Sequence, residues 1–189
     1  WSSDVCSSDL TVSTSDAGPI IKNDDDWEQN WSGGANTYGT FAARYSGALG
    51  NTLKVSMADA NTYTGWSYET QFTSAPGTST YVQNKGQSGA NDEIHIIVVD
   101  EDGGFTGTKG TVLEKFGFVS KASDAKDESG NSNYYKNVIA AESMYVHWMS
   151  HPETVSGNIT WGSAATANTF KLLTANVTVS LSAGADGSI

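Results

Sequence analysis

Six residues near the middle of the chain, Ile94 to Val99, constrain the fold most, because they alternate between two faces that are both largely apolar. On a strand, the two sets of side chains would be Ile94, Ile96 and Val98 on one face, and His95, Ile97 and Val99 on the other. A strand with two apolar faces lies inside a sheet that is covered on both sides. We therefore predict a central strand here. We interpret His95 as a hydrogen-bonded interior histidine, since no second metal ligand lies at a suitable spacing.

The composition favours one β-rich domain of short strands and many turns. The 189 residues include 20 glycines, while 38% are hydrophobic and only 16% are charged. The formal net charge of −11 argues against a surface that neutralises nucleic-acid phosphates. No apolar run approaches the roughly 18 residues needed to cross a bilayer. We expect neither a nucleic-acid partner nor a membrane partner.

Acidic residues follow the central strand directly. An Asp-Gly pair within Asp100 to Gly104 predicts a turn, and Val112 to Val119 is expected to return as the second strand of a hairpin. The run from Asp100 to Asp102 resembles part of a calcium loop, but it lacks the third ligand position and the later bidentate glutamate. Glu114 could suggest a carboxylate pair for glycoside cleavage, yet glutamate on the solvent face of a strand is common.

A run of three aspartates, Asp24 to Asp26, precedes two tryptophans. Trp27 and Trp31 are four residues apart, so a short helix would place both on one face, with the carboxylates at its positive end. Such a helix could lie on a sheet. Calcium binding is a more specific alternative, but adjacent aspartates point in different directions and cannot all reach one ion easily.

Two glycines, Gly47 and Gly50, precede an alternating apolar pattern at Leu53, Val55 and Met57. This order predicts a glycine-rich turn that feeds a half-buried strand. A phosphate-binding loop is excluded, because the string SGALGN lacks the Gly-Lys-Ser/Thr ending and the strand follows the glycines.

The segment from Asn61 to Tyr81 is rich in aromatic residues, and Pro76 with Gly77 predicts a turn inside it. The rings belong to Tyr63, Trp66, Tyr68, Phe72 and Tyr81. Aromatic stripes of this kind can form a sugar-binding platform, but packing of the rings on a sheet is the simpler interpretation.

The polar stretch from Ser120 to Asn133 is expected to be exposed. A short helix is predicted from Ser132 to Ala141, with its first residue or Asn131 as the cap. Strands are expected at Tyr145 to Trp148 and within Phe170 to Leu181. Together these patterns predict a mainly β protein with short helices (α+β), built as an antiparallel β-sandwich flanked by small helices.

Two histidines, His147 and His151, have the spacing of zinc ligands on a helix. No glutamate stands beside the first one, and Pro152 disfavours a helix there. We therefore assign no metal ligand, no cofactor-binding residue and no catalytic residue to this chain.

Three stretches of the sequence resemble a known family, and they occur in the same order as in that family. They are ARYSGALGNTLKVSM from Ala43, the long run NDEIHIIVVDEDGGFTGTKGTVLEKFGFVSKASDAKDESGNSNYYKNVI from Asn91, and TVSLSAGADGS from Thr178. Together they resemble the contractile tail sheath proteins of T4-like myoviruses, over roughly residues 41–188. Residues 11–40 and 61–80 match that family poorly.

The resemblance implies that residues 41–189 form the β-rich protruding domain of a sheath subunit, without the core domain that carries the interlocking arms. It implies a structural, non-enzymatic protein of the virion tail, present in the host cytoplasm during assembly. The full subunit would form a helical homo-oligomer around the tail tube, respond to the baseplate and contract to drive genome delivery. The alternative function is a carbohydrate- or calcium-binding β-sandwich module.

The ends of the chain suggest an internal fragment. Residues 1–10, WSSDVCSSDL, lack the basic and apolar regions of a signal peptide and look like sequencing-adapter read-through, so we expect them to be artefactual or disordered. They hold the single cysteine, Cys6, so neither disulfides nor thiol catalysis are expected elsewhere. Residues 11–40 are a polar segment that the sequence does not assign to a domain. We expect the isolated chain to be monomeric.

Overall fold

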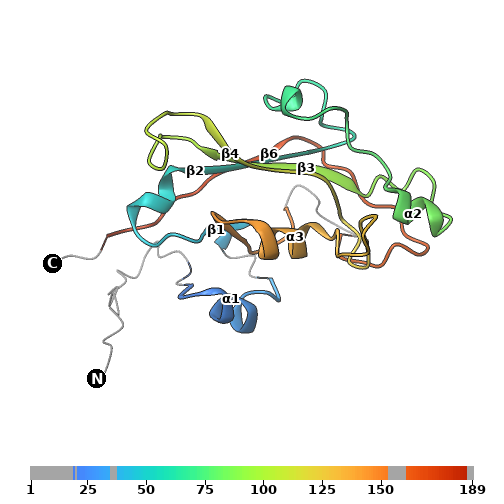
Figure 1. The fold of residues 1–189 in the computed structure, drawn as a ribbon, viewed down its shortest axis with the longest axis horizontal. Coiled ribbons are helices and arrows are strands. Elements are labelled where there is room, and N and C mark those ends of the chain that lie inside the picture. The colour runs from blue at the N-terminus through green and yellow to red at the C-terminus, as the bar shows by residue number, and fades with distance from the viewer. Residues whose placement is uncertain (1–18, 20, 35–37, 153–160, 187–189) are drawn as a thin grey trace.

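The computed structural model describes residues 19, 21–34, 38–152 and 161–186. Its centre is an antiparallel four-stranded sheet in the order β4-β3-β2-β6. The strands are β2 (Leu53–Asp59), β3 (Glu93–Asp100), β4 (Thr111–Ser120) and β6 (Val177–Ser180). The first three form a meander, and β6 pairs with the other edge of β2 (Figure 1). The prediction of a central strand at Ile94 to Val99 is confirmed, because β3 lies between two strands and those six residues are fully buried.

A second layer lies on one face of this sheet (Figure 1). Its small sheet pairs β1 (Phe41–Ala43) with β5 (Val146–Trp148), and α3 (Tyr135–Glu142) lies beside it. Helix α1 (Asp24–Asn30) covers the far side of this layer. The architecture is therefore mainly antiparallel β, with two sheets and a few short helices, as predicted.

The main core fills the space between the two layers. The four-stranded sheet contributes alternate side chains from β2 and β3, and the second layer contributes residues such as Tyr135 and Ile139 of α3. All of these side chains have no more than 1% of their surface exposed. Burying one aliphatic side chain of this size is worth about 1.5–3 kcal/mol, so this interlayer contact contributes substantially to stability.

Helix α1 confirms the short helix predicted from the aspartates and the two tryptophans that follow them. The Asn23 side chain caps it by accepting a hydrogen bond from the Asp26 amide. Trp27 is buried in the main core and donates its indole N–H to the carbonyl of Trp148 at 2.7 Å, and Trp31 packs against the same core. The helix thus lies on the small sheet.

The opposite face of the four-stranded sheet is covered by the first part of the connection between β2 and β3, which includes the short helix η3 (Glu69–Gln71). Later in this connection, α2 (Thr80–Asn84) lies at the end of the sheet where β3 begins. Trp66 is only 2% exposed and donates its indole N–H to the Ser56 hydroxyl at 2.9 Å. Phe72 stacks on Trp66 and on His95. Packing of these aromatic rings on the sheet is confirmed.

Two local predictions before β3 are wrong. The glycine-rich segment forms the short helix η2 (Ala48–Thr52), but β2 is covered on both faces and not half-buried, because Trp66 shields Ser56. Pro76 and Gly77 form no turn. The Gly77 carbonyl accepts the Glu93 amide and the Gly77 amide donates to the Glu93 carboxylate, which holds this extended segment beside the start of β3.

The segments after β4 differ from prediction at their boundaries. The hairpin of β3 and β4 is confirmed, but α3 begins at Tyr135, because Ser132 and Tyr134 instead form isolated bridges with Lys126 and Ser120. The stretch predicted to be exposed begins with buried residues, among them Lys121. Strand β5 is confirmed, whereas only Val177–Ser180 of the expected final strand is a strand. None of the helices among the described residues is long and apolar enough to cross a membrane.

Candidate functional site

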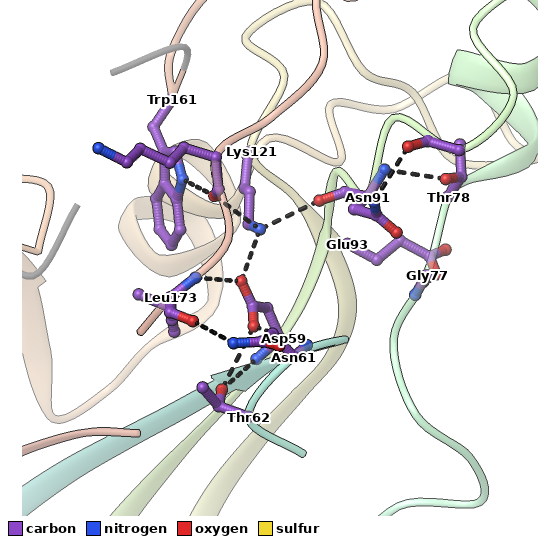
Figure 2. Close-up of polar contacts among 12 residues, drawn as sticks. Asp59, Asn61, Thr62, Gly77, Thr78, Asn91, Glu93, Lys121, Trp161 and Leu173 are labelled. Carbon is purple, nitrogen blue, oxygen red and sulfur yellow. Dashed lines mark hydrogen bonds and ion pairs between the residues drawn. The ribbon is translucent and has the colours of Figure 1, made fainter. Parts of the chain in front are cut away.

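A buried ion pair, Lys121 with Asp59, is the most unusual polar feature of the described residues. The ammonium nitrogen of Lys121 lies 3.0 Å from Oδ2 of Asp59, and both side chains are completely inaccessible to solvent. Figure 2 shows the pair surrounded by groups from four segments of the chain. Transferring two charges from water into the interior costs several kcal/mol per ion, so their other partners decide whether the pair is tolerated.

The Lys121 ammonium uses each of its three hydrogens. Besides Asp59, it donates to the carbonyl of Asn91 at 3.0 Å and to the carbonyl of Lys171 at 3.3 Å. It also lies 4.9 Å from the ring centre of Trp161, whose indole N–H donates to the same Lys171 carbonyl. Burial lowers the pKa of Lys121, and the nearby carboxylates of Asp59 and Asp92 oppose that shift. The amine is thus fully engaged within the protein.

The Asp59 carboxylate is saturated in the same way. Its Oδ2 also accepts the Leu173 amide at 2.7 Å, while Oδ1 accepts the Asn61 amide at 3.1 Å and the Thr62 hydroxyl at 3.3 Å. The Asn61 side chain in turn donates to the Leu173 carbonyl at 2.9 Å (Figure 2). These donors come from Lys121, from the residues that follow β2 and from the C-terminal segment.

The meander explains how these groups meet. Asp59 ends β2, Asn91 precedes β3 and Lys121 follows β4, so antiparallel pairing brings all three to the same end of the sheet. The segment around Lys171 and Leu173 then crosses that end and closes the cluster. The pair therefore ties three strands to the C-terminal part of the chain.

A second buried carboxylate, Asp92, stands next to this cluster. It accepts hydrogen bonds from the amide and the hydroxyl of Ser79, both at 2.8 Å, and from the hydroxyl of Ser120. Ser79 also caps α2 by accepting the Val82 amide. Asp92 thus fixes the start of α2 against the end of β4, and it presents no free oxygen for chemistry.

This arrangement suits mechanical cohesion and not catalysis. A catalytic lysine or aspartate needs a free face toward a substrate, and the described part of the cluster gives neither Lys121 nor Asp59 such a face. Among the described residues, no group of three or more His, Cys, Asp or Glu side chains is placed to hold a metal ion.

The three carboxylates of the acidic turn after β3 each bind a different partner. Asp100 accepts the amides of Phe105 and Thr106 and the hydroxyl of Thr106 through Oδ2. Burial raises the pKa of Asp100, but these hydrogen bonds outweigh it and hold the pKa below its usual value. Glu101 pairs with Lys54 and Asp102 with Lys109, so the three carboxylates do not converge.

The other acidic candidates serve local structure. Glu114 is half-buried, and its carboxylate accepts the Ser143 hydroxyl and the Met144 amide, both at 2.7 Å. Asp24 pairs with Arg44, which also donates to the carbonyls of Ala140 and Val146. Arg44 thereby joins α1, α3 and β5 around β1.

His95 is the interior histidine that the sequence predicts. Its Nδ1 accepts the Phe118 amide at 3.1 Å, which leaves Nε2 to donate to the Ser74 carbonyl at 2.9 Å. This pairing fixes one neutral tautomer. Burial lowers the pKa of His95.

His147 and His151 have different surroundings. His147 stacks on Trp27, and its buried Nδ1 has no hydrogen-bond partner among the described residues. The Tyr135 hydroxyl and Nδ1 of His151 are hydrogen-bonded at 2.6 Å, and the same hydroxyl accepts the indole N–H of Trp148. Burial lowers the pKa of both histidines to about 4. The two imidazoles thus contact different aromatic rings of the main core: Trp27 for His147, and Tyr135, Trp148 and Trp161 for His151.

A hollow of about 610 Å³ lies between β4 and α3. Three asparagines in its lining are committed to the chain: Asn131 donates to Asp127, Asn133 to the Phe118 carbonyl and Asn137 to the Ser132 hydroxyl. These three amide groups are therefore not free to orient a ligand in the hollow.

Sequence reasoning missed the pair of Lys121 and Asp59. They lie 62 positions apart, and each is followed by residues that look like part of an ordinary loop. The small residues Ala122 and Ala125, which are buried after Lys121, were the available sign that this stretch turns inward.

Comparison with known proteins relates the chain to phage tails. It is 34% identical over 73 residues to a tail sheath protein of Salmonella phage ViI. The match covers 39% of this chain and 10% of that protein, so the chain spans only a small part of its relative. No protein-family model matches the chain. The similarity supports a relationship to phage tail sheath proteins in general, without singling out the T4-like group.

Proposed function

We propose that this chain is the outer, β-rich part of a bacteriophage tail sheath subunit. The observation that carries the proposal is the 34% identity to the Salmonella phage ViI tail sheath protein. The role is structural and not enzymatic. In the complete subunit, the part described here would sit on a larger domain that polymerises around the tail tube, so the chain belongs to the virion after assembly in the host cytoplasm.

The internal structure is compatible with a body that moves as a unit. The buried charges of Lys121, Asp59 and Asp92 bond within the chain, and Arg44 ties the second layer together. Helical arrays grow through heterologous contacts that propagate without closing, and contraction is a change between two packings of such contacts. Subunits that repack without unfolding need this kind of internal cohesion.

The finer proposal is that the full subunit belongs to a T4-like contractile sheath. Its neighbours would be identical subunits, with the tail tube and the baseplate contacted through the larger domain. Contraction would release free energy stored during assembly, with no nucleotide hydrolysed. The net charge of −11 suits an outer surface that remains in solvent.

The second candidate, a carbohydrate- or calcium-binding module, receives less support. Four of the aromatic rings, Tyr63, Trp66, Tyr68 and Phe72, pack on the sheet, and Trp66 is nearly inaccessible. Tyr81 packs instead in a separate small cluster beside α2. A sugar platform requires exposed ring faces. The carboxylates of Asp100, Glu101 and Asp102 have separate partners, whereas calcium requires six to eight converging oxygens.

The complete reading frame tests the proposal. Long reads across the source locus would extend the frame on both sides, and the encoded protein would be expressed and viewed by negative-stain electron microscopy. We expect tubular polymers from the complete protein and a monomer from the 189-residue chain in sedimentation velocity. A complete protein that forms no tubes but binds calcium or a glycan in calorimetry would favour the module instead.

A further inference from the structure

The fold holds an amine and a carboxyl group in contact inside the protein. The side-chain nitrogen of Lys121 lies 3.0 Å from Oδ2 of Asp59, and neither side chain is accessible to solvent. An amine and a carboxylic acid can condense to an amide when they are held against each other and water is excluded. Holding two groups in place inside one molecule acts like a very high local concentration of both. The pair therefore has the proximity and the dry surroundings that amide formation requires.

Burial also favours the neutral forms of the two groups, which are the reactive forms. An amine can attack a carbonyl carbon only after it has given up the extra proton of its ammonium form. Burial lowers the pKa of Lys121, and Oδ2 of Asp59 is the carboxylate oxygen to which its nitrogen donates. Transfer of one proton along this hydrogen bond converts a buried ion pair into a neutral amine and a neutral carboxylic acid.

The second oxygen of Asp59 is held where negative charge would develop during the attack. This oxygen, Oδ1, accepts the Asn61 amide at 3.1 Å and the Thr62 hydroxyl at 3.3 Å. Fixed donors of this kind stabilise the oxyanion of a tetrahedral intermediate. Oδ1 is therefore suited to remain as the carbonyl oxygen of an amide, while Oδ2, on the side of Lys121, is the oxygen that can leave.

We propose that Lys121 and Asp59 condense after folding to form an isopeptide bond, which is a covalent link between the two side chains. The Lys121 nitrogen bonds to Cγ of Asp59, and the bond from Cγ to Oδ2 breaks. Two of the three ammonium hydrogens leave with Oδ2 as one water molecule, and the third stays on the new amide nitrogen. Atoms and charge balance without an oxidant or any other reactant. The ion pair described above is the state before condensation.

The surroundings of the pair also suit the product. The remaining N–H of the new amide can donate to the Asn91 carbonyl, which the ammonium already contacts at 3.0 Å. The Lys171 carbonyl loses the ammonium but keeps the indole N–H of Trp161 at 2.8 Å. The Leu173 amide loses Oδ2 as an acceptor, and the removal of two charges from the interior offsets this cost.

The link would join two strands that are not neighbours in the sheet. Asp59 ends β2 and Lys121 follows β4, with β3 between these two strands. The bond would close a loop across 62 positions of the chain. A closed loop reduces the conformational freedom of the unfolded chain. The linked protein should therefore unfold at a higher urea concentration than the protein that carries only the ion pair.

Intact mass spectrometry of the 189-residue chain tests the proposal. The purified protein would be kept folded at neutral pH, and samples taken over days would be denatured and weighed. We expect conversion, during expression or storage, to a species that is lighter by one water molecule. Peptide mapping should show the peptide of Asp59 joined to the peptide of Lys121. Chain that is refolded from guanidinium chloride should convert, whereas chain kept unfolded should not, because only the fold brings the two side chains together.

Two variants and an internal control make the assay specific. Asp59→Ala removes the carbon that is attacked, and Lys121→Arg replaces the amine by a guanidinium that stays protonated. Neither variant should form the link, and the unaltered chain still decides the test if a variant fails to fold. The internal control is the pair of Lys109 and Asp102, whose nitrogen and oxygen are 3.2 Å apart but largely exposed. The peptides of this pair should stay separate.

Each outcome of the mass measurement bears on the proposal. Full mass in the folded chain throughout storage, with Asp59 and Lys121 in separate peptides, overturns it. A loss of water that maps only to Asp102 and Gly103 also overturns it, because an Asp-Gly pair can lose the same mass by closing a succinimide ring. A joined peptide that is absent from both variants supports it. The formation of tubes by a complete subunit is measured separately, so the isopeptide bond and the sheath function can fail independently.

Discussion

Replacing Lys121 by methionine removes one charge of a pair whose two side chains are completely buried. The Asp59 carboxylate would keep its hydrogen bonds from Leu173, Asn61 and Thr62 but lose its only cationic partner in the described cluster. The carbonyls of Asn91 and Lys171 would each lose the ammonium donor as well. The variant thus leaves an uncompensated charge inside the protein.

The expected cost is large compared with the stability of a domain. Breaking a buried ion pair by removing one partner costs about 3–5 kcal/mol. Native domains are stable by about 5–15 kcal/mol in total. For a domain of this size, 1 kcal/mol shifts the unfolding midpoint by about 2–4 °C, so Lys121→Met should lower Tm by roughly 6–20 °C.

Urea denaturation followed by circular dichroism and tryptophan fluorescence would measure this cost. Lys109→Met is the matched control, because the pair of Lys109 and Asp102 has the same chemistry but is largely exposed. We expect the control to cost about 0–1 kcal/mol. A double-mutant cycle with Asp59→Asn should give a coupling energy above about 1 kcal/mol, and the corresponding cycle with Asp102→Asn should give almost none. If Lys121→Met costs no more than Lys109→Met, the pair is not the structural tie described above.

Two further perturbations test other parts of the structure. The pKa of His147 and of His151 falls from 6.5 to about 4 through burial, so between these pH values the unfolded chain binds more protons. Stability should therefore fall as pH decreases from 6.5 to 4, by up to about 3 kcal/mol for each histidine. His147→Phe should reduce the change of the urea unfolding midpoint with pH. An unchanged pH dependence would contradict the assignment. Gly184→Ala should cost about 1–3 kcal/mol in the same assay, because the new Cβ would meet the Gly47 carbonyl oxygen, whereas Gly33→Ala has open space and should be nearly neutral; equal effects would refute the close contact.

Sequence patterns predicted an element correctly where the pattern itself shows which of its faces must be covered. The double-sided apolar alternation at Ile94 to Val99 required cover on both faces, and the structure provides it. The same logic failed at β2, because Ser56 looks solvent-facing in the sequence. Its hydroxyl is in fact covered and hydrogen-bonded by Trp66, which comes from a loop whose path the sequence does not specify.

Features that depend on residues far apart in the chain could not be predicted from the sequence. The cap predicted at Ser132 for α3 was overridden by strand-like bridges that hold Ser132 and Tyr134. Lys121 reads as part of a solvated polar stretch until Asp59, Asn91 and the C-terminal segment are seen around it. No local propensity encodes a contact across 62 residues, so the candidate site had to come from the three-dimensional structure.

The order in which the tie is completed has a consequence for biosynthesis. A nascent chain holds β2, β3 and β4 once Ser120 has been made, and these strands can pair as a meander of neighbouring segments. Lys121 would then be pressed against Asp59 before Lys171 and Leu173 exist to complete its surroundings. The growing chain should therefore keep this end of the sheet hydrated and open until about fifty more residues have been added, which are the 52 after Lys121 up to Leu173. Ribosomes stalled before Leu173 should carry a sheet with one loose end, and release past that residue should close it.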